Sequence, residues 1–403
     1  MRALVLGYGR SGKAAEALLC RSGFSVAALD GETPFPSGDF DVAVVSPGVA
    51  LTHPWIVEAR RRGIPLKSEL QLGCEELKRQ GWKLVAVTGS KGKSSVVKLV
   101  ADAIGLSGRH AVPCGNYGVP VCEVASSSGA GNSSEASCSG DSRDARWAVV
   151  EVSSFMMETT ELPSDAFEAA AILNLQEDHL DRHGSVEVYH GLKRKLLTMT
   201  RRPVDFAAAL PLQQPLFQKS YFDNEILREN GCCAIALMRA AGLDDACIAQ
   251  AFRDFVPLPH RMNLIAERNG VRFIDDSKAT SLAALVAGVK MASPIPHPSI
   301  LLIAGGLPKG DEPKSALSTL TERVKKVYLI GQSAEAFFAA WKGAVDCEIC
   351  GTMERAVERA LREAESGETV LLSPGTASFD QFRSFGERGD VFTILVKGES
   401  KSK

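Results

Sequence analysis

The chain has 403 residues, and its 46 lysines and arginines against 48 aspartates and glutamates give a net charge of −2. This balance, without a long basic run, argues against binding to nucleic acid or to an anionic membrane surface, so we expect small-molecule partners. No stretch approaches the roughly 18 consecutive apolar residues of a membrane helix, and the N-terminus lacks the pattern of a signal peptide. We therefore expect a cytoplasmic protein without membrane insertion, whose ten scattered cysteines are reduced thiols rather than a disulfide framework.

The length suits two to four domains, and we expect the first over residues 1–81. An apolar strand at 2–6 runs into a glycine turn and a helix, and the strand at 24–29 then ends at Asp30. This β-α-β order is typical of a nucleotide-binding fold in which an acid meets a ribose hydroxyl, although the glycine pattern alone is weak evidence. A further strand at 42–45 leads into Ser46, Pro47 and Gly48.

A glycine-containing loop follows the apolar run Leu84–Val87 and opens a helix. Such a loop directs successive backbone N–H groups inward at a helix N-terminus, where a lysine and a serine can serve a nucleotide phosphate and its Mg²⁺. The spacing differs from the ordinary phosphate-binding loop, which would require glycine where Val87 stands. The alternative is a simple glycine turn before a helix. The loop residues are Gly89, Ser90, Lys91, Gly92, Lys93, Ser94 and Ser95.

This loop opens a second domain, which we expect over residues 82–256. Its strands are predicted at Leu84–Val87, Trp147–Val152 and Ala169–Leu173, and helical segments between them favour a parallel sheet. The segment 126–142 consists almost entirely of Ser, Gly, Asn and Ala, so we expect a disordered surface loop there.

A third α/β domain is expected over residues 257–403, after Pro257-Leu258-Pro259. Polar segments follow its strands, as in Asp275-Asp276-Ser277-Lys278, and ligands of open α/β sheets bind beyond the carboxyl ends of strands. Cys347 and Cys350 fall in a short predicted strand and lack the further ligands of a zinc site. The other strands are predicted at Val271–Ile274, Ile300–Ala304, Lys326–Ile330 and Thr369–Leu372.

Two segments of the second domain carry candidate metal ligands. Glu151 ends a predicted strand beside the phosphate loop, where a Mg²⁺ ligand of a nucleotide enzyme belongs, although such a glutamate is often only a solvated strand end. The segment from Asn174 to His183 holds three carboxylates and two imidazoles, with His179 as the leading ligand candidate. The alternative is a charged helix start capped by Asp178.

Taken in order, these segments resemble the ATP domain of the Mur ligases, which build the peptide stem of bacterial peptidoglycan. The resemblance spans nearly the whole chain. The C-terminal motifs are similar to those of the branch that adds D-glutamate to UDP-N-acetylmuramoyl-L-alanine, and Asp276-Ser277-Lys278 differs from the motif of the diaminopimelate- and lysine-adding relatives. The matching segments are Thr88–Ser95, Gly115–Gly118, Glu151–Phe155, Asn174–Arg182, Pro259–Arg261, Phe273–Thr280 and Ser373–Phe382.

The resemblance implies a Rossmann-like UDP-binding domain, a central P-loop ATPase-type domain with a parallel sheet, and a Rossmann-like C-terminal domain that binds the amino acid. We expect a monomer, since the sequence shows no obvious oligomerisation segment. ATP would convert a carboxylate into an acyl phosphate, and the incoming amine would displace phosphate, with release of ADP. Lys93 would hold the β- and γ-phosphates, and Lys278 would serve catalysis. Ser94 and Glu151 would ligate one Mg²⁺, and His179 would ligate a second. Lys193 stands where the family has a lysine that becomes carbamylated and then serves as a metal ligand.

Further roles follow from the same resemblance. Asn230, Arg261 and Asp276 would hold the base, phosphate and ribose of ATP. The D-glutamate site would use Thr280, Lys309, Ser378 and Phe385 in addition to Lys278. The UDP-substrate would contact Arg10, Ser11, Asp30, Ser46, Gly48 and Asn116.

The chain departs from the family pattern at several places. Lys91 stands where the family loop has Asn, Leu307-Pro308 precedes Lys309 in place of small or polar residues, and Ile226-Leu227 replaces a His-Asn pair before Asn230. The segments 30–46 and 193–230 are shorter than the corresponding segments of the family. We still expect activity, because the main site residues occur together. Three alternatives stay open: a ligase for another amino acid, a degenerate homologue without catalysis, and a dinucleotide-dependent oxidoreductase built on the first glycine turn.

Overall fold

The computed structural model describes residues 1–127, 145–206, 215–293 and 297–398. Contacts divide the chain into two compact units, called here unit 1 (residues 1–223 and 227–255) and unit 2 (residues 224–226 and 256–403). The predicted α/β class with parallel sheets is confirmed. The three-domain division stays a prediction, and the Ser/Gly-rich loop expected at 126–142 lies outside the described residues from residue 128 onward.

The first sheet of unit 1 is fully parallel, in the order β2-β1-β3-β4. Alternate residues of β1 enter different cores: Ala3 and Val5 pack with α1 and α3, whereas Leu4 and Leu6 pack with α2. A strand buried on both faces is typical of a parallel sheet covered by helices. The elements are β1 (Arg2–Leu6), α1 (Arg10–Arg21), β2 (Ser25–Leu29), β3 (Val42–Val45), α2 (Pro54–Arg61), β4 (Leu66–Ser68) and α3 (Glu69–Arg79).

The second sheet of unit 1 is also parallel, in the order β6-β7-β5-β8-β9. Its three central strands were predicted and are confirmed, whereas both edge strands were missed. Each edge strand contains a proline. Proline has no N–H to donate to a neighbouring strand, so it is tolerated at a sheet edge, where one side of the strand has no neighbour. The strands are β5 (Lys83–Thr88), β6 (Ala111–Gly115), β7 (Trp147–Glu151), β8 (Ala169–Ile172) and β9 (Pro203–Asp205).

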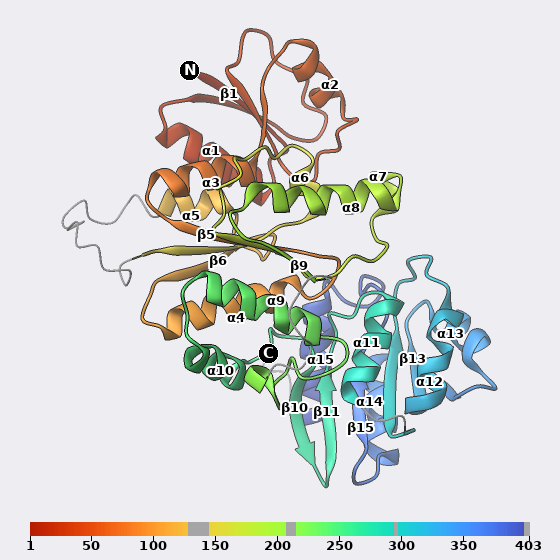
Figure 1. Ribbon diagram of the computed structural model, residues 1–403. Coiled ribbons are helices and arrows are strands. Elements are labelled where there is room, and N and C mark those ends of the chain that lie inside the picture. The colour runs from red at the N-terminus through yellow and green to blue at the C-terminus, as the bar shows by residue number, and fades with distance from the viewer. Residues whose placement is uncertain (128–144, 207–214, 294–296, 399–403) are drawn as a thin grey trace. The chain divides into compact units, whose positions relative to one another are not determined.

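Helices cover both faces of this second sheet. Figure 1 shows α3, α5 and α8 on one face, and α4, α9 and α10 on the other. The additional helices are α4 (Lys93–Leu106), α5 (Val121–Ser127), α6 (Ser154–Met157), α7 (Leu180–His183), α8 (Val186–Lys195), α9 (Arg228–Ala240) and α10 (Asp245–Asp254), with short 3₁₀ segments at Leu196–Met199 and Pro215–Phe217.

Unit 2 is built on a six-stranded sheet in the order β10-β11-β15-β12-β13-β14, in which only the β10–β11 pair is antiparallel. The four predicted strands and the short strand around Cys347 are confirmed, whereas β10 was missed. Asn269 and Gly270 join β10 to β11, both with positive φ, as a tight hairpin turn requires. The strands are β10 (Asn263–Arg268), β11 (Val271–Asp275), β12 (Ile300–Gly305), β13 (Val324–Ile330), β14 (Asp346–Gly351) and β15 (Thr369–Leu372).

The helices of unit 2 again form two layers. Side chains of α11, α12 and α13 share one core with the sheet, and those of α14 and α15 share the core on its other face. The helices are α11 (Leu282–Ala292), α12 (Leu317–Arg323), α13 (Ala334–Trp341), α14 (Met353–Glu363) and α15 (Phe385–Lys397), with a 3₁₀ segment at Pro313–Ala316.

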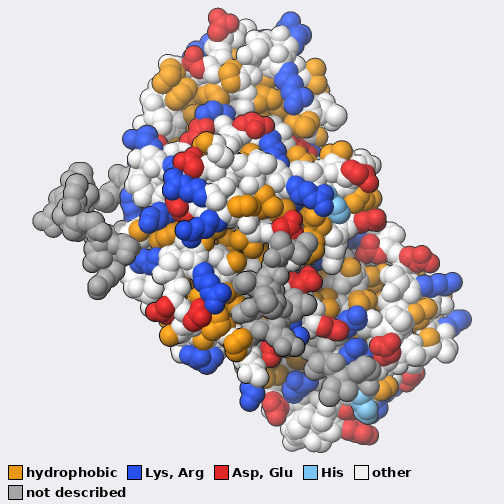
Figure 2. Space-filling view, viewed as in Figure 1, with side chains coloured by type: hydrophobic (Ala, Val, Ile, Leu, Met, Phe, Trp, Pro, Cys, Tyr) orange, Lys and Arg blue, Asp and Glu red, His pale blue; other side chains and the backbone are white. Residues whose placement is uncertain are grey.

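Charges are mixed over the face of the protein that Figure 2 shows. In Figure 2, lysine and arginine side chains are interspersed with aspartate and glutamate over the face in view. Among the described residues, no helix combines the length and the apolar composition needed to cross a membrane.

Candidate functional site

The predicted phosphate loop connects β5 to α4, at the carboxyl edge of the second sheet. Gly89 and Gly92 have φ values of 152° and 81°, which L-residues rarely adopt, and a Cβ built on Gly92 would overlap the Asn230 amide. Gly92 is the N-cap of α4 and has no side chain with which to cap this helix. The first N–H groups of α4 are therefore oriented toward the loop, as in anion sites at helix N-termini.

Asn174, which follows β8, holds the middle of the phosphate loop. Its Oδ1 accepts from the Lys91 N–H at 2.9 Å, and its Nδ2 donates to the Lys91 carbonyl at 2.9 Å. The same Nδ2 lies 3.2 Å from Asn230 Oδ1, and the Asn174 carbonyl accepts from the Ser90 N–H. The sequence motif contained Asn174, but its role as a clamp was missed.

Two lysines converge on the Gly89 carbonyl. The Lys93 ammonium donates to it at 2.8 Å and to the Ser90 carbonyl at 3.2 Å, and the Lys193 ammonium donates to it at 3.0 Å. The Lys193 side chain is buried, with 1% of the residue exposed. Burial, together with the nearby charge of Lys93, lowers the pKa of Lys193 to about 7. A large share of this amine is therefore neutral near physiological pH.

Glu151, the last residue of β7, is buried next to the phosphate loop. Its Oε1 accepts from Asn116 Nδ2 at 2.7 Å, whereas its Oε2 is buried without a hydrogen-bond partner. A buried carboxylate oxygen without a donor is suited to a cation ligand. The described residues include no group of three or more His, Cys, Asp or Glu that could hold a metal. Mg²⁺ bound through one or two protein oxygens and substrate phosphates does not need such a group.

The candidate ligand His179 is the N-cap of α7 and adopts a left-handed conformation, with φ of 53°. Its ring centroid lies 4.9 Å from that of Phe155, and its backbone N–H donates to Asp178 Oδ1 at 3.0 Å. Asp178 Oδ2 lies 3.8 Å from His179 Nε2 and also 3.8 Å from Lys91 Nζ. The phosphate loop and the His179 segment are thus in electrostatic contact through Lys91 and Asp178.

Arg182 links this segment to the first sheet. Its guanidinium forms a bidentate pair with Glu158, with a shortest distance of 2.6 Å, and donates to the Val49 carbonyl at 2.8 Å. Val49 directly follows Gly48 of the predicted UDP-substrate site. Arg182 belongs to the segment Asn174–Arg182 of the sequence motif, but that motif did not predict this contact.

The predicted UDP-substrate residues of the first sheet gather at its carboxyl edge. Arg10 and Ser11 open α1, and Asp30 follows β2. Ser46 Oγ donates to the Gly7 carbonyl at 2.6 Å, which ties the end of β3 to the glycine turn after β1. Arg10 also pairs with Glu123 of α5 at 3.4 Å. This edge combines a helix N-terminus with an arginine, a hydroxyl and a carboxylate.

In unit 2, predicted residues lie on loops at the carboxyl edge of the sheet. Asp276 is buried and accepts from Ser373 Oγ at 2.9 Å, and burial raises its pKa to about 7. The Lys278 ammonium lies 3.9 Å from the Phe385 ring centroid. Leu307 N–H donates to the Ala377 carbonyl, so the unusual Leu307-Pro308 segment lies beside the loop that carries Ser378.

Arg388 of α15 is the residue of unit 2 that the sequence analysis missed most clearly. It is fully buried, and its guanidinium donates to the carbonyls of Ser277, Thr376 and Ala377 and to Ser277 Oγ. These acceptors belong to the two loops that carry Lys278 and Ser378. Burial lowers the pKa of Arg388 to about 10, which leaves the guanidinium charged at neutral pH.

Three further predicted residues of unit 2 are placed less specifically. Arg261 lies in the turn after Pro259, where its N–H donates to Asn263 Oδ1 and to the Leu258 carbonyl. Thr280 lies on the loop between β11 and α11, and Lys309 on the loop after β12. Asn230, in α9, belongs to unit 1 together with the phosphate loop.

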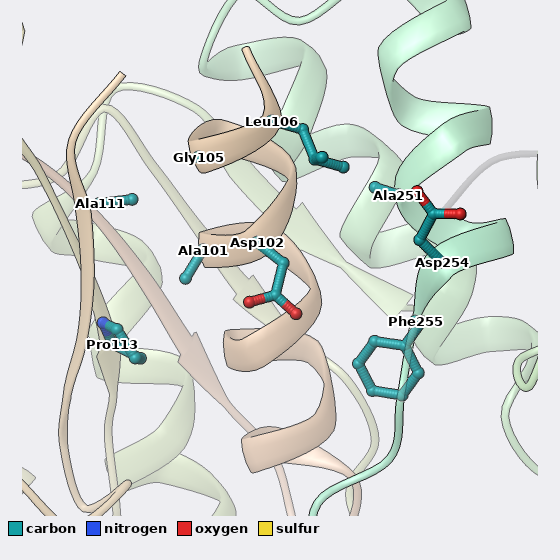
Figure 3. A pocket seen from close by; sticks show the side chains of 9 residues that line it. All are labelled: Ala101, Asp102, Gly105, Leu106, Ala111, Pro113, Ala251, Asp254 and Phe255. Carbon is teal, nitrogen blue, oxygen red and sulfur yellow. The ribbon is translucent and has the colours of Figure 1, made fainter. Parts of the chain in front are cut away.

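A surface hollow of about 500 Å³ lies away from these residues, at the C-terminal end of α4 (Figure 3). Side chains of α4 and of the end of α10 flank it. Its two acids already have partners: Asp102 pairs with Lys98, and Asp254 accepts from Gln250. None of the predicted site residues lines this hollow.

Comparisons with known proteins identify the family of this chain. Residues 87–220 match the family model of the Mur ligase middle domain, and residues 260–375 match that of the Mur ligase, glutamate ligase domain. The chain is 32% identical to UDP-N-acetylmuramoylalanine--D-glutamate ligase of Chlamydia caviae, over 98% of this chain and 97% of that protein. It is 33% identical to the enzyme of the same name from Gloeobacter violaceus, over 97% of this chain and 98% of that protein.

Solved structures show the same fold at lower identity. The UDP-N-acetylmuramate-alanine ligase MurC of Thermotoga maritima aligns with a TM-score of 0.60 and 16% identity, over 99% of this chain and all of that chain. The MurF ligase of Thermotoga maritima in complex with ADP aligns with a TM-score of 0.56 and 15% identity, over 89% of this chain and 95% of that chain.

Proposed function

Because this chain belongs to the Mur ligase family, we propose that it is an ATP-dependent ligase that joins D-glutamate to UDP-N-acetylmuramoyl-L-alanine in peptidoglycan precursor synthesis. The carrying observation is the identity of 32–33%, over nearly the full length of both proteins, to relatives that bear the name of that activity. The terminal carboxylate of the UDP-substrate would take the γ-phosphoryl group of ATP and form an acyl phosphate. The amine of D-glutamate would then attack its carbonyl carbon and release phosphate.

The phosphate loop would bind ATP through its backbone N–H groups and through Lys93. Lys93 donates to the loop's own carbonyls, so its ammonium lies within the loop, which supports this role. Ser94 and Glu151 would hold one Mg²⁺, and the unpartnered Glu151 Oε2 supports this assignment. Mg²⁺ bound there would neutralise phosphate charge during transfer. Asn116 would keep the Glu151 carboxylate oriented.

His179 and Lys193 are proposed as ligands of a second Mg²⁺. A neutral amine is the form that attacks CO₂, with formation of an N–C bond and loss of a proton to give a carbamate. The lowered pKa of Lys193 keeps much of the amine in this form. Its burial would protect the carbamate from solvent. The side chain would thereby change from a cation to a carboxylate-like ligand.

The loops of unit 2 would bind the incoming amino acid. D-glutamate carries two carboxylates, so cations and hydroxyls suit its site, and Lys278, Thr280, Lys309 and Ser378 supply them. Phe385 contacts the Lys278 ammonium and would fix its direction.

The nucleotide and the UDP-substrate would use the remaining predicted residues. Asp276 and Arg261 would reach the ribose and phosphates of ATP, and Asn230 its base. The first sheet would bind the UDP moiety through the N-terminus of α1, Arg10, Ser11, Asp30, Ser46 and Gly48. We further propose that the enzyme works as a cytoplasmic monomer.

A coupled phosphate-release assay tests the proposal. Phosphate release should require ATP, UDP-N-acetylmuramoyl-L-alanine and D-glutamate together. A panel that replaces D-glutamate by L-glutamate, diaminopimelate or lysine should give little release. ATP hydrolysis that is indifferent to the amino acid would contradict the proposal, and release with a different member of the panel would reassign the substrate.

A further inference from the structure

Lys91 has a contact that the proposed reaction does not use. Its ammonium lies 3.8 Å from Asp178 Oδ2, beyond hydrogen-bond distance. Asn174 holds both the N–H and the carbonyl of Lys91, so a change of partner by the ammonium requires only the side chain to move. Asp178 in turn holds the backbone N–H of His179, which we assign to the metal site.

The pair between Lys91 and Asp178 is easily separated. Both side chains are partly exposed, at 42% and 34%, and exposed ion pairs contribute little because water screens them. A triphosphate in the loop would present several negative charges to the same ammonium. Charge-assisted bonds to phosphate oxygens are stronger than a long contact to a single carboxylate.

We propose that Lys91 exchanges its partner when the nucleotide binds: its ammonium leaves Asp178 for the triphosphate and frees the Asp178 carboxylate for the accompanying cation. This inference rests on the proposed ATP site. Lys91 is then a second phosphate-binding lysine besides Lys93, and Asp178 is its resting partner. The chain thereby gains a phosphate contact that does not depend on a metal.

Metal-free ATP binding tests the exchange directly. ATP is titrated in the presence of EDTA, and binding is measured by isothermal titration calorimetry. The dissociation constant should be about tenfold higher for Lys91→Met than for the unmodified protein, as expected for a lost bond to phosphate. Asp178→Asn should bind metal-free ATP about threefold more tightly, because the lysine no longer has a competing partner. In Mg²⁺ titrations, the same Asp178→Asn variant should need more Mg²⁺ for half-maximal ATP binding.

The double variant separates exchange from simple long-range electrostatics. If Lys91 moves from Asp178 to phosphate, most of the gain from Asp178→Asn should disappear in the Lys91→Met background, because no lysine remains to be released. Independent charges would give additive effects. The matched control is the Lys98–Asp102 pair of α4, for which Lys98→Met and Asp102→Asn should leave ATP binding unchanged.

The outcomes separate this inference from the proposed function. Unmodified protein that binds no ATP, with or without Mg²⁺, would overturn both. If the unmodified protein binds ATP normally, three results would overturn the exchange alone. They are an unchanged ATP affinity in Lys91→Met, additive effects of the two substitutions on ATP affinity, and weaker ATP binding in both single variants. Weakening by both variants would indicate that the pair only fastens two loops together.

Discussion

The conformation of Gly92 gives a sharp test of how the phosphate loop is built. Gly92 has φ of 81°, and a Cβ there would overlap the Asn230 amide. Gly92→Ala should therefore lose about 1 kcal/mol through left-handed strain. The displaced Asn230 side chain would lose its bond from Asn174, for about 1 kcal/mol more. Together these effects predict a destabilisation of about 2 kcal/mol and weaker ATP binding.

The free energy of unfolding is measured by urea denaturation, with circular dichroism as the readout. Gly105→Ala is the matched control. Gly105 lies in the same helix with open space around its Cβ position, so alanine should stabilise α4 by about 0.5–1 kcal/mol. In the Gly92→Ala background, Asn230→Ala removes the overlap and should cost less than it does alone. Equal unfolding midpoints for the two alanine variants, or additive losses in the double variant, would refute this reasoning.

Other changes should produce equally specific results. Lys93→Ala and Glu151→Ala should each lower kcat at least about a hundredfold with unchanged circular dichroism, and near-normal turnover in either would remove that residue from the site. Lys193 has a folded pKa of about 7, below its unfolded value, so the unfolded chain binds the extra proton. Lys193 therefore adds a contribution to stability that grows as the pH rises from 7 to 10, and the urea midpoint of Lys193→Met relative to that of the unmodified protein should fall across that range. Arg388→Met should destabilise unit 2 by about 3 kcal/mol, because several buried acceptors lose their donor, with only partial recovery in Arg388→Lys.

The interior strands were predictable from the sequence, whereas three edge strands, β6, β9 and β10, were missed. Central strands such as β5 and β12 are continuous apolar runs, which a strand buried on both faces requires. Edge strands lack that requirement: β6 and β9 contain proline, and β10 is partly exposed with a register shift. The Asn269-Gly270 pair was a usable hairpin signal for β10 that the sequence analysis did not apply.

The candidate site was predictable where it follows from topology. Residues at the carboxyl ends of parallel strands lie at one edge of their sheet, which placed Glu151 and the phosphate loop at an edge in unit 1, and Asp276 at an edge in unit 2, without knowledge of the contacts. Contacts between distant segments were not predictable in this way. The clamp between Asn174 and Lys91 spans 83 residues, and Arg388 reaches a loop 111 residues away. Such pairs depend on side-chain packing, which no local pattern encodes.

The contact of Arg182 with the Val49 carbonyl has a consequence for protein engineering. This contact joins the first sheet of unit 1 to a segment that follows the second sheet. The hydrogen bond between the Ser68 and Thr160 hydroxyls and the core shared by α1, α3 and α5 also connect these two parts. A chimera that exchanges only residues 1–81 with a relative would cut through all of these contacts. Residues 1–255 should therefore be exchanged as one cassette, which would keep these contacts intact and move the residues proposed for the UDP-substrate together with the phosphate loop.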